Sequence, residues 1–330
     1  MKANFKLGDT GVRVIAFFII LGIFAAINPV VLSLLNIFSI ANNASFLGIM
    51  SIGVMVVMLT GNIDVSVTSI GLISAYTTIM VFMNLGIDEG GMVLMFLISG
   101  FVGILCGLIN AFFIYKFNIP GIIVSLGMAQ IYNSILIVLF GITHLNILPT
   151  GMRMLGRTML LSIETELGVA SINVSVLIFL GSILLVWFVL NKTMIGRGIY
   201  ALGGDRDVTV RIGFNVPLVY SVAYGIMGLL AGIGGMMFFA HATFFMGDYI
   251  QMALNNILGA VILGGVILQG GKGTVGGVVV GVLLIGLINN NLHLIGIPSF
   301  AQRVTVGAIL LISVAFTYVN QLKEKKITGI

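Results

Sequence analysis

Polar side chains of the kind that contact small solutes gather in one short segment of an otherwise apolar chain. The segment covers residues 60–69 and contains the amide of Asn62, the carboxylate of Asp64 and several hydroxyls, among them that of Ser66. Ionisable groups at membrane depth are costly, so they usually face a cavity or a polar partner. Gly61 and the β-branched residues after it disfavour a continuous helix. The segment is interpreted as a break between two membrane helices.

Two roles are open for Asp64. In the first, the break is a discontinuous helix that borders a translocation route, because non-helical backbone at membrane depth is tolerated only beside protein or water. In the second, Asp64 caps the following helix by accepting backbone N–H groups. The two roles are compatible with each other.

A second polar group, made of uncharged amides, lies near the other end of the chain. Gln251 and Asn255 are four residues apart, which predicts that they share one helical face, and Asn256 follows. Uncharged amides suit a neutral polyhydroxylated solute, and hydrogen bonds between helices are the alternative interpretation. A Gly-rich break at Gly264–Gly273 comes next, so the two halves of the chain resemble each other weakly.

Residues arranged for catalysis are missing from the sequence. The three histidines, His144, His241 and His293, are far apart, and none has a metal-ligand neighbour at i+3 or i+4. The P-loop pattern GxxxxGK[ST] is absent, although Gly270–Thr274 looks similar. The sequence therefore predicts no catalytic residue, no metal site and no cofactor in this chain.

Composition places the whole chain in a membrane. Of 330 residues, 59% are hydrophobic and 8% are charged, with a mean hydropathy of +1.21. Soluble domains are about 25% charged, so a soluble fold is excluded. No linker or charge run divides the sequence, which predicts one domain over residues 1–330. The expected fold is an all-α polytopic integral membrane protein with about ten transmembrane helices, some short or broken.

A membrane helix needs roughly 20 mainly apolar residues, and ten ranges approach this length. They are Val14–Leu35, Ala44–Leu59, Val67–Phe82, Met92–Tyr115, Ile119–Phe140, Ile172–Leu190, Pro217–Ala240, Leu254–Leu268, Val275–Leu292 and Val304–Val319. The second, third and eighth are short. One sizeable connection, Gly141–Ser171, is expected on the outside.

Basic residues predict the orientation, because cytoplasmic loops retain Lys and Arg. Ten spans put both termini on one side, which then holds twelve basic residues: Lys2, Lys6, Arg13, Lys116, Lys192, Arg197, Arg206, Arg211, Lys272, Lys323, Lys325 and Lys326. The opposite side holds Arg153, Arg157 and Arg303. Both termini are therefore predicted to be cytoplasmic.

The longest predicted cytoplasmic connection, Lys192–Val216, mixes apolar residues with charges of both signs. It contains a short stretch with helical promise, and Asp205 in it is suited to be the N-cap of a helix. A small helix lying against a cytoplasmic protein would use both kinds of residue. An ordinary basic connection beside lipid headgroups is the alternative.

Several motifs, in order along the chain, resemble those of ABC importer permeases for ribose and other simple sugars, within the branched-chain amino acid permease superfamily. Gly61–Val67 is similar to the family's GGIDLSVG, and Asn118–Gly127 to its IPxFIVTLG. Gly196–Asp205 is similar to GRxIYAIGGN, with Ile212–Val216 as the turn after it, and Gly264–Gly271 is similar to VIGGTSLxGG.

The resemblance implies a permease subunit of an importer in the bacterial cytoplasmic (inner) membrane, with several passes through the bilayer. Its partners would be a cytoplasmic ABC ATPase that binds the ATP and Mg, an extracytoplasmic solute-binding protein acting at the outer loops, and a second permease copy, identical or not. No nucleic acid is expected. The translocation candidates are Asn62, Asp64, Ser66, Ser125, Gln251, Asn255 and Asn256. The candidates for coupling to the ATPase are Gly196, Arg197, Tyr200, Gly203, Gly204 and Asp205.

The chain departs from the family pattern at places that bear on the solute. Asn62 and Thr68 stand where the family has glycine, and Leu254 and Asn256 stand where an acidic pair is usual. A simple sugar is the first expectation, with autoinducer-2, a nucleoside or a branched-chain amino acid as alternatives. An ion-coupled secondary transporter with Asp64 as its ion or proton site is a rival, and a polytopic membrane enzyme is a weaker one.

Overall fold

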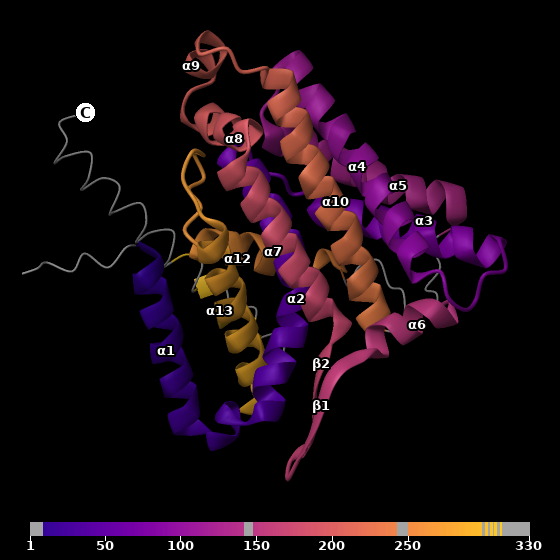
Figure 1. Cartoon of the computed structure of the whole chain (residues 1–330), viewed down its shortest axis with the longest axis vertical. Coiled ribbons are helices and arrows are strands. Elements are labelled where there is room, and N and C mark those ends of the chain that lie inside the picture. The colour runs from indigo at the N-terminus through magenta and orange to yellow at the C-terminus, as the bar shows by residue number, and fades with distance from the viewer. Residues whose placement is uncertain are drawn as a thin grey trace, which may run out of the picture.

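The computed structural model describes residues 9–141, 148–242, 250–298 and a few positions between 301 and 311. These residues form a bundle of helices with one projecting β-hairpin (Figure 1). The elements are α1 (Asp9–Ile27), η1 (Pro29–Leu32), α2 (Leu34–Leu59), α3 (Val67–Asn84), α4 (Met92–Phe117), α5 (Gly121–Phe140), α6 (Thr150–Arg157), β1 (Met159–Thr165), β2 (Gly168–Asn173), α7 (Val174–Lys192), α8 (Met194–Gly204), α9 (Arg206–Arg211), α10 (Val216–Ala242), α12 (Leu254–Leu263) and α13 (Val275–Leu294).

Eight of the described helices are long and apolar enough to cross a membrane: α1, α2, α3, α4, α5, α7, α10 and α13. The predicted all-α polytopic fold is therefore confirmed. The predicted span Leu254–Leu268 corresponds to α12, which is only 10 residues long. The predicted span Val304–Val319 lies almost wholly outside the described residues. Which end of the bundle faces the cytoplasm stays a prediction.

The predicted boundaries of the first two spans are wrong. The chain turns at η1, inside the predicted span Val14–Leu35, where Asn28 accepts the N–H of Val30 and Pro29 begins the short helix. Ser33 then caps α2, which is 26 residues long and not short. Polar residues near the start of α2 lower its local hydropathy, but they are paired inside the protein. Asn36, for example, hydrogen-bonds Asn290 and Asn291 of α13.

The predicted outer connection Gly141–Ser171 contains regular structure that hydropathy did not predict. It holds α6 and the antiparallel pair β1–β2. The Asn42 side chain of α2 holds the hairpin by donating to the carbonyl of Ser171 at 2.8 Å and accepting the N–H of Asn173 at 2.9 Å. Asp88, between α3 and α4, holds α6 by accepting the N–H and O–H of Thr150, each at 2.8 Å. We call this end of the bundle the hairpin end and the opposite one, with α8 and α9, the α8 end (Figure 1).

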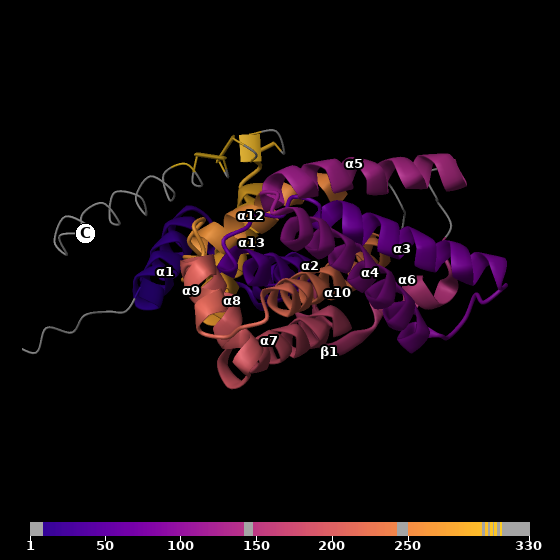
Figure 2. The same cartoon turned by 90° about the horizontal axis from the view of Figure 1, so that it is seen from above.

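Helices α2, α3 and α10 form the centre of the bundle, and α1 lies at its edge. In the most apolar 18 residues of α2 and of α10, 78% and 72% are buried, compared with 6% in α1. Viewed from above, α5 and α7 lie on opposite sides of this centre (Figure 2). Both α5 and α7 therefore present one face away from the protein.

Glycines bring two pairs of helices into backbone contact, as the GxxxG spacings predict. Gly103 and Gly107 of α4 lie directly against Gly228 of α10, where added Cβ atoms would overlap backbone atoms of the facing helix. Gly277 and Gly281 of α13 lie in the same way against the backbone of α12. These small residues therefore allow both pairs of helices to pack closely.

Candidate functional site

The predicted break at residues 60–66 is present and separates α2 from α3. Residues 60 and 61 form a turn, with Gly61 at φ +81°, and residues 62–66 have no regular structure before α3 begins at Val67. The hydroxyl of Thr60 donates to the carbonyl of Val57 at 2.7 Å and closes the last turn of α2. The discontinuity between two apolar helices is therefore real, and its polar groups need partners.

Asp64 is the centre of a fully buried hydrogen-bond cluster. Its Oδ1 accepts the backbone N–H of Ser66 at 2.7 Å and the Ser66 hydroxyl at 2.6 Å. Its Oδ2 accepts Nδ2 of Asn110, from α4, at 3.2 Å. The Tyr132 hydroxyl of α5 donates to Oδ1 of Asn110 at 2.9 Å. The cluster thus ties the break to α4 and α5 through side chains.

These contacts give Asp64 a position between the two predicted roles. It accepts a backbone N–H, as a cap does, but that N–H belongs to Ser66, which precedes the first residue of α3. Asp64 therefore closes a turn within the break. Its side chain has no exposed surface, so it reaches a solute only if the break opens. A role of Asp64 and Ser66 in translocation stays a prediction.

Asn62 and Ser125 fasten the break to the start of α5. Oδ1 of Asn62 accepts the N–H of Gly121, the first residue of α5, at 3.0 Å. Nδ2 of Asn62 donates to the Tyr220 hydroxyl of α10 at 3.4 Å. Oγ of Ser125 accepts the N–H of Val65 at 3.2 Å. Both predicted residues therefore lie in this cluster as structural contacts of the break.

Gln251 joins a second polar cluster at the beginning of α3. Its Oε1 accepts the Thr68 hydroxyl at 3.0 Å. Its Nε2 donates to Oγ of Ser69 at 3.2 Å and to Oδ1 of Asn133, from α5, at 3.2 Å. This uncharged cluster links three separate parts of the chain, and Gln251 and Asn133 keep part of their surface exposed.

The predicted common helical face of Gln251 and Asn255 is wrong. Helix α12 begins at Leu254, so Gln251 lies before it and the four-residue spacing does not place the amides on one helix. Asn255 is exposed and Asn256 is half-buried. A turn at residues 252 and 253 interrupts the helix where the sequence shows only ordinary apolar residues.

Thr68 and Ser69 of the second cluster lie in the polar segment 60–69 singled out from the sequence, but sequence reasoning missed Asn133 of that cluster and three residues of the first, Asn110, Tyr132 and Tyr220. Each was counted as part of an apolar span. Asn110 carries the one available signal, since a single amide in a long apolar helix requires a buried partner. Among the described residues no three His, Cys, Asp or Glu side chains gather.

The second predicted break, between α12 and α13, lies against the first. Gly265, Gly270 and Gly271 all have positive φ, and the N–H of Gly271 donates to the carbonyl of Leu59, at the end of α2, at 3.0 Å. The hydroxyl of Thr274 accepts the N–H of Gly277 and caps α13. The two breaks thus meet at the α8 end of the bundle.

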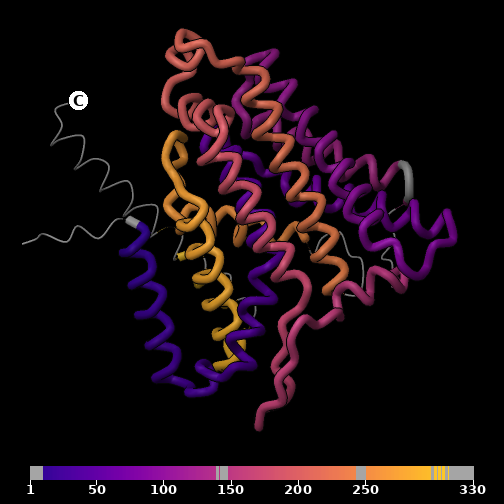
Figure 3. Tube along the Cα trace, in the orientation of Figure 1, coloured from indigo at the N-terminus to yellow at the C-terminus, as the bar shows by residue number. Residues whose placement is uncertain are grey.

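The predicted coupling segment folds as α8 and packs on both breaks (Figure 3). An added Cβ on Gly203 would overlap the carbonyl oxygen of Leu59 and the backbone of Gly271. The Tyr200 hydroxyl donates to the carbonyl of Gly273 at 3.0 Å. Gly196 is buried against α7. These three coupling candidates therefore face the protein interior.

The other three coupling candidates face outward. Arg197, Gly204 and Asp205 are exposed, and nothing lies within 4 Å of an added Cβ on Gly204. Oδ1 of Asp205 accepts the N–H of Val208 at 3.0 Å, so Asp205 is the N-cap of α9, as its sequence position predicts. An outward face of α8 and α9 remains for contact with a partner.

Known proteins similar to this chain are membrane permeases. Residues 36–314 match the family described as branched-chain amino acid transport system / permease component. The ribose import permease protein RbsC of Bacillus subtilis is 30% identical over 305 residues, which cover 91% of this chain and 90% of that protein. RbsC of Escherichia coli strain K12 is 29% identical, with 91% of each chain covered.

The autoinducer 2 import system permease protein LsrC of Photorhabdus luminescens is also similar. It is 27% identical over 306 residues, which cover 92% of this chain and 87% of that protein. No solved structure matches the chain.

Proposed function

The chain belongs to the branched-chain amino acid transport system permease family, and from this premise we propose that it forms the translocation path for a simple sugar. It is a multi-pass permease subunit of the sugar ABC importer type, in the bacterial cytoplasmic membrane. The proposed solute is a ribose-like pentose or a hexose. A separate ATPase, which binds ATP and Mg²⁺, would supply the energy.

The similarity to ribose import permeases over about nine-tenths of both chains carries this proposal. The second polar cluster supports it, because its amides and hydroxyls are all uncharged. Such groups match the hydroxyls of a neutral sugar and offer no counter-charge to the amino and carboxylate groups of a free amino acid. The similarity to an autoinducer 2 permease favours a second candidate, a sugar-like furanosyl signal.

We place the ATPase on the outward face of α8 and α9. Val208, Val210 and Ile212 are half or more exposed there, Arg211 lies between the last two in the chain, and Arg197 is exposed on α8. Asp205 and Asp207 are exposed there as well. An apolar patch with a charged rim is typical of a protein-binding surface. This face lies at the end that the basic residues predict to be cytoplasmic.

A docked ATPase would act on both breaks through α8. Gly203 touches the end of α2 and the second break, and Tyr200 holds the carbonyl of Gly273. Because interior packing is dense, a shift of α8 is passed to its neighbours and not absorbed. The proposed consequence is that closing of the ATPases moves both breaks together and exposes the path to one side or the other.

Reconstitution tests the proposal directly. Vesicles would contain the chain in two copies, its ATPase and its solute-binding protein, and uptake of labelled ribose, a hexose and autoinducer 2 would be compared. ATP-dependent accumulation of a sugar is expected. Accumulation of autoinducer 2 alone would favour the second candidate, and accumulation without the ATPase would favour an ion-coupled transporter.

A single substitution tests the docking face. Gly204→Arg should leave the fold intact, because the position is exposed and open. It should uncouple ATP hydrolysis from uptake, since a bulky charge would lie at the surface on which the ATPase docks. Uptake and ATP hydrolysis are measured on the same vesicles. Normal coupling in this variant would show that the ATPase binds elsewhere.

A further inference from the structure

A buried hydroxyl without a partner lies beside the first break. Tyr224 of α10 has no exposed surface, and its hydroxyl makes no hydrogen bond within the part of the chain that the structure describes. The hydroxyl of Tyr132, also buried, shows the usual arrangement, because it donates to the carbonyl of Cys106 and to Oδ1 of Asn110. An unpaired hydroxyl has given up its hydrogen bonds to water without replacing them, so it requires an explanation.

The side chain of Asn62, in the first break, offers the missing acceptor. An added Cβ on Gly121 would lie 2.7 Å from Oδ1 of Asn62 and 2.9 Å from the Tyr224 hydroxyl, so both oxygens lie close to the first residue of α5. In this structure Oδ1 of Asn62 accepts the N–H of Gly121 at 3.0 Å. A displacement of the start of α5 would free Oδ1 to accept the Tyr224 hydroxyl instead.

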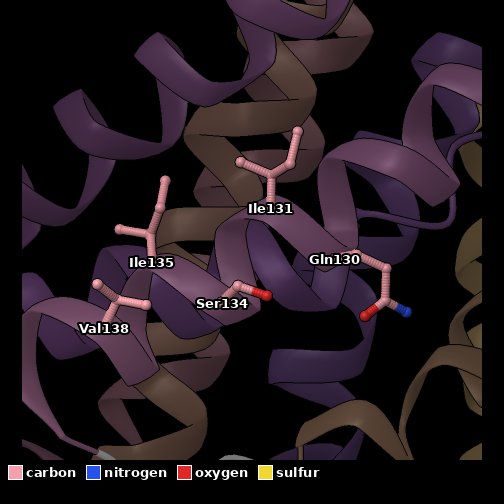
Figure 4. Close-up of a pocket in the computed structure, with 5 residues that line it drawn as sticks. All are labelled: Gln130, Ile131, Ser134, Ile135 and Val138. Atoms are coloured by element: carbon pink, nitrogen blue, oxygen red, sulfur yellow. The ribbon is translucent and has the colours of Figure 1, made fainter.

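Helix α5 is less confined than α10, to which Tyr224 belongs. Among the most apolar 18 residues of each helix, 33% are buried in α5 and 72% in α10. The outer face of α5 carries Ile131 and Ile135, which are exposed and line a shallow groove (Figure 4). By contrast, the carbonyl of Tyr224 lies directly against Gly107 of α4, where an added Cβ would overlap it. A displacement of α5 relative to Tyr224 is therefore a smaller rearrangement than a displacement of α10.

The position of Asn62 connects this pair to α8, on which we place the ATPase. An added Cβ on Gly61, the residue before Asn62, would lie 3.7 Å from the Cα of Gly203. The motif that Gly61–Val67 resembles has glycine in place of Asn62, and glycine has no side chain with which to bind Gly121 or Tyr224. An exchange of partners at Asn62 is therefore a property of this chain and does not follow from the family resemblance.

We propose that Asn62 and Tyr224 are positioning residues that hold the first break in two alternative arrangements of the transport cycle. The inference rests on the proposed function. In the arrangement described here, Asn62 holds the start of α5 through Gly121, and the Tyr224 hydroxyl is unpaired. In the other, the start of α5 has moved away and the Tyr224 hydroxyl donates to Asn62. This hydrogen bond shifts the ratio of the two arrangements about three- to tenfold toward the second.

Removal of the unpaired hydroxyl tests the inference, because Tyr224→Phe keeps the ring. Thermal stability should not fall, since no hydrogen bond is lost, and ATP-dependent sugar uptake should fall about three- to tenfold, since the second arrangement loses its hydrogen bond. The matched control is Tyr132→Phe, which removes a buried but paired hydroxyl and should lower thermal stability. If Tyr224→Phe lost as much stability as Tyr132→Phe, the Tyr224 hydroxyl would already be paired, for instance with a buried water, and the inference would be overturned.

Hydrogen exchange at the start of α5 gives a readout that a merely structural role would not change. In the intact wild-type complex, a non-hydrolysable ATP analogue should raise exchange in the peptide that contains Gly121, because its N–H is released from Asn62. In Tyr224→Phe the rise should be about three- to tenfold smaller. An equal rise in both proteins would overturn the inference.

A double variant tests whether Tyr224 acts through Asn62. Asn62→Gly introduces the residue of the family motif and removes the acceptor. In this background Tyr224→Phe should cause no further change in uptake, because the hydrogen bond of the second arrangement is already absent. Additive losses in the double variant would show that Tyr224 acts through another group and would overturn the inference.

The failures of the two proposals are distinguishable. If the wild-type complex takes up no sugar, but the nucleotide raises exchange at Gly121 and Tyr224→Phe reduces that rise, the proposed function fails and the two arrangements stand. If sugar is taken up, and Tyr224→Phe matches the wild type in uptake and in exchange, the two arrangements fail and the proposed function stands.

Discussion

The two breaks lie side by side at one end of the bundle, yet they are held in different ways. The first, between α2 and α3, is stabilised by side chains from α4, α5 and α10 that bind Asn62, Asp64 and Val65. The second, between α12 and α13, is stabilised mainly by backbone hydrogen bonds, and Tyr200 of α8 adds one side-chain contact. There the N–H of Ile267 donates to the carbonyl of Lys272 at 3.1 Å, and the N–H of Gly270 donates to the carbonyl of Ile267 at 3.0 Å.

The difference follows from how deeply each break is buried in the protein. Asp64 and Ser66 are fully buried, so their polar groups must find partners within the protein. Gln269 and Lys272 are exposed, so water can hydrogen-bond to polar groups of the second break. Glycines with positive φ let the chain turn tightly there. The buried break needs a dedicated network of polar side chains, whereas the more exposed break relies mainly on backbone that can adopt positive φ.

Removing the Asp64 carboxylate should have the largest effect. Asp64→Ala leaves the Ser66 N–H and hydroxyl without their acceptor and takes one of two acceptors from the Asn110 amide. Each unsatisfied buried group costs about 1–3 kcal/mol. We expect a loss of at least about 3 kcal/mol in stability in detergent and little transport. Thermal unfolding of the purified protein measures it.

A charge exchange sharpens this test. Asp64→Asn alone places two amide donors opposite each other, and the double variant Asp64→Asn with Asn110→Asp restores a donor facing a carboxylate. Partial recovery of stability in the double variant is expected. If Asp64→Ala were as stable as the wild type, the first break would not depend on side chains.

Gly270→Ala should have the next largest effect and should damage the second break through its backbone. Gly270 has φ +89°, and an added Cβ would lie 2.9 Å from the Cα of Gly203. We expect a loss of about 2 kcal/mol from strain and crowding. Gly276→Ala is the control, since that position is open and has no positive φ. Equal stability of the two variants would contradict the assignment.

Loss of a helix cap should have a smaller effect. The Thr274 hydroxyl accepts the N–H of Gly277, whereas Ser66, at the corresponding position before α3, makes no side-chain cap bond. Thr274→Val should therefore cost about 1 kcal/mol. Ser66→Ala should cost more, because Ser66 binds Asp64 and Asn110 instead. If thermal unfolding showed a larger loss of stability for Thr274→Val than for Ser66→Ala, the proposed difference between the two breaks would be contradicted.

Loss of the charge of Asp88 should have the smallest effect. Asp88 is an exposed counterpart of the buried Asp64. Hydrogen bonds from the backbone and hydroxyl of Thr150, with Arg153 nearby, hold the pKa of Asp88 below its ordinary value. A lowered pKa in the folded state means that the contact with α6 is intact above the ordinary Asp pKa of about 3.9 and weakens as the pH falls below it.

The protection of α6 against hydrogen exchange should fall as the pH drops below the ordinary Asp pKa of about 3.9 and through the lower folded-state pKa. In Asp88→Asn, the protection of α6 against exchange, relative to an unfolded chain, should be lower at neutral pH and should not fall further in acid. If the protection of α6 in the wild type did not change with pH, the role of Asp88 would be contradicted.

The sequence predicts the breaks well and their partners poorly. Gly61, the polar run after it and the glycines at 264–273 signal the breaks locally, because backbone that cannot continue a helix is encoded in adjacent residues. Asn110 and Tyr132 lie in spans that hydropathy reads as uniformly apolar, and their roles depend on contacts across 46 and 22 residues of sequence. Long-range pairing of this kind has no periodic signature.

The same reasoning explains the two wrong predictions about helices. The polar start of α2 lowers hydropathy, although Asn36 and Asn42 are paired with α13 and the hairpin. The amides near α12 share a spacing of four but not a helix, because a turn precedes Leu254. Spacing indicates a common face only where the helix is continuous.

The glycine contact between α4 and α10 has a consequence for how the subunit can move. Ser99, Gly103 and Gly107 recur every four residues against Gly232, Gly228 and Tyr224, so that main chain meets main chain along the seam. Sliding one helix by less than a whole repeat, about 6 Å, would drive bulkier side chains into the facing carbonyls. Helices α4 and α10 are therefore expected to move as one rigid unit. Any rearrangement during a transport cycle would then occur where this pair contacts other helices.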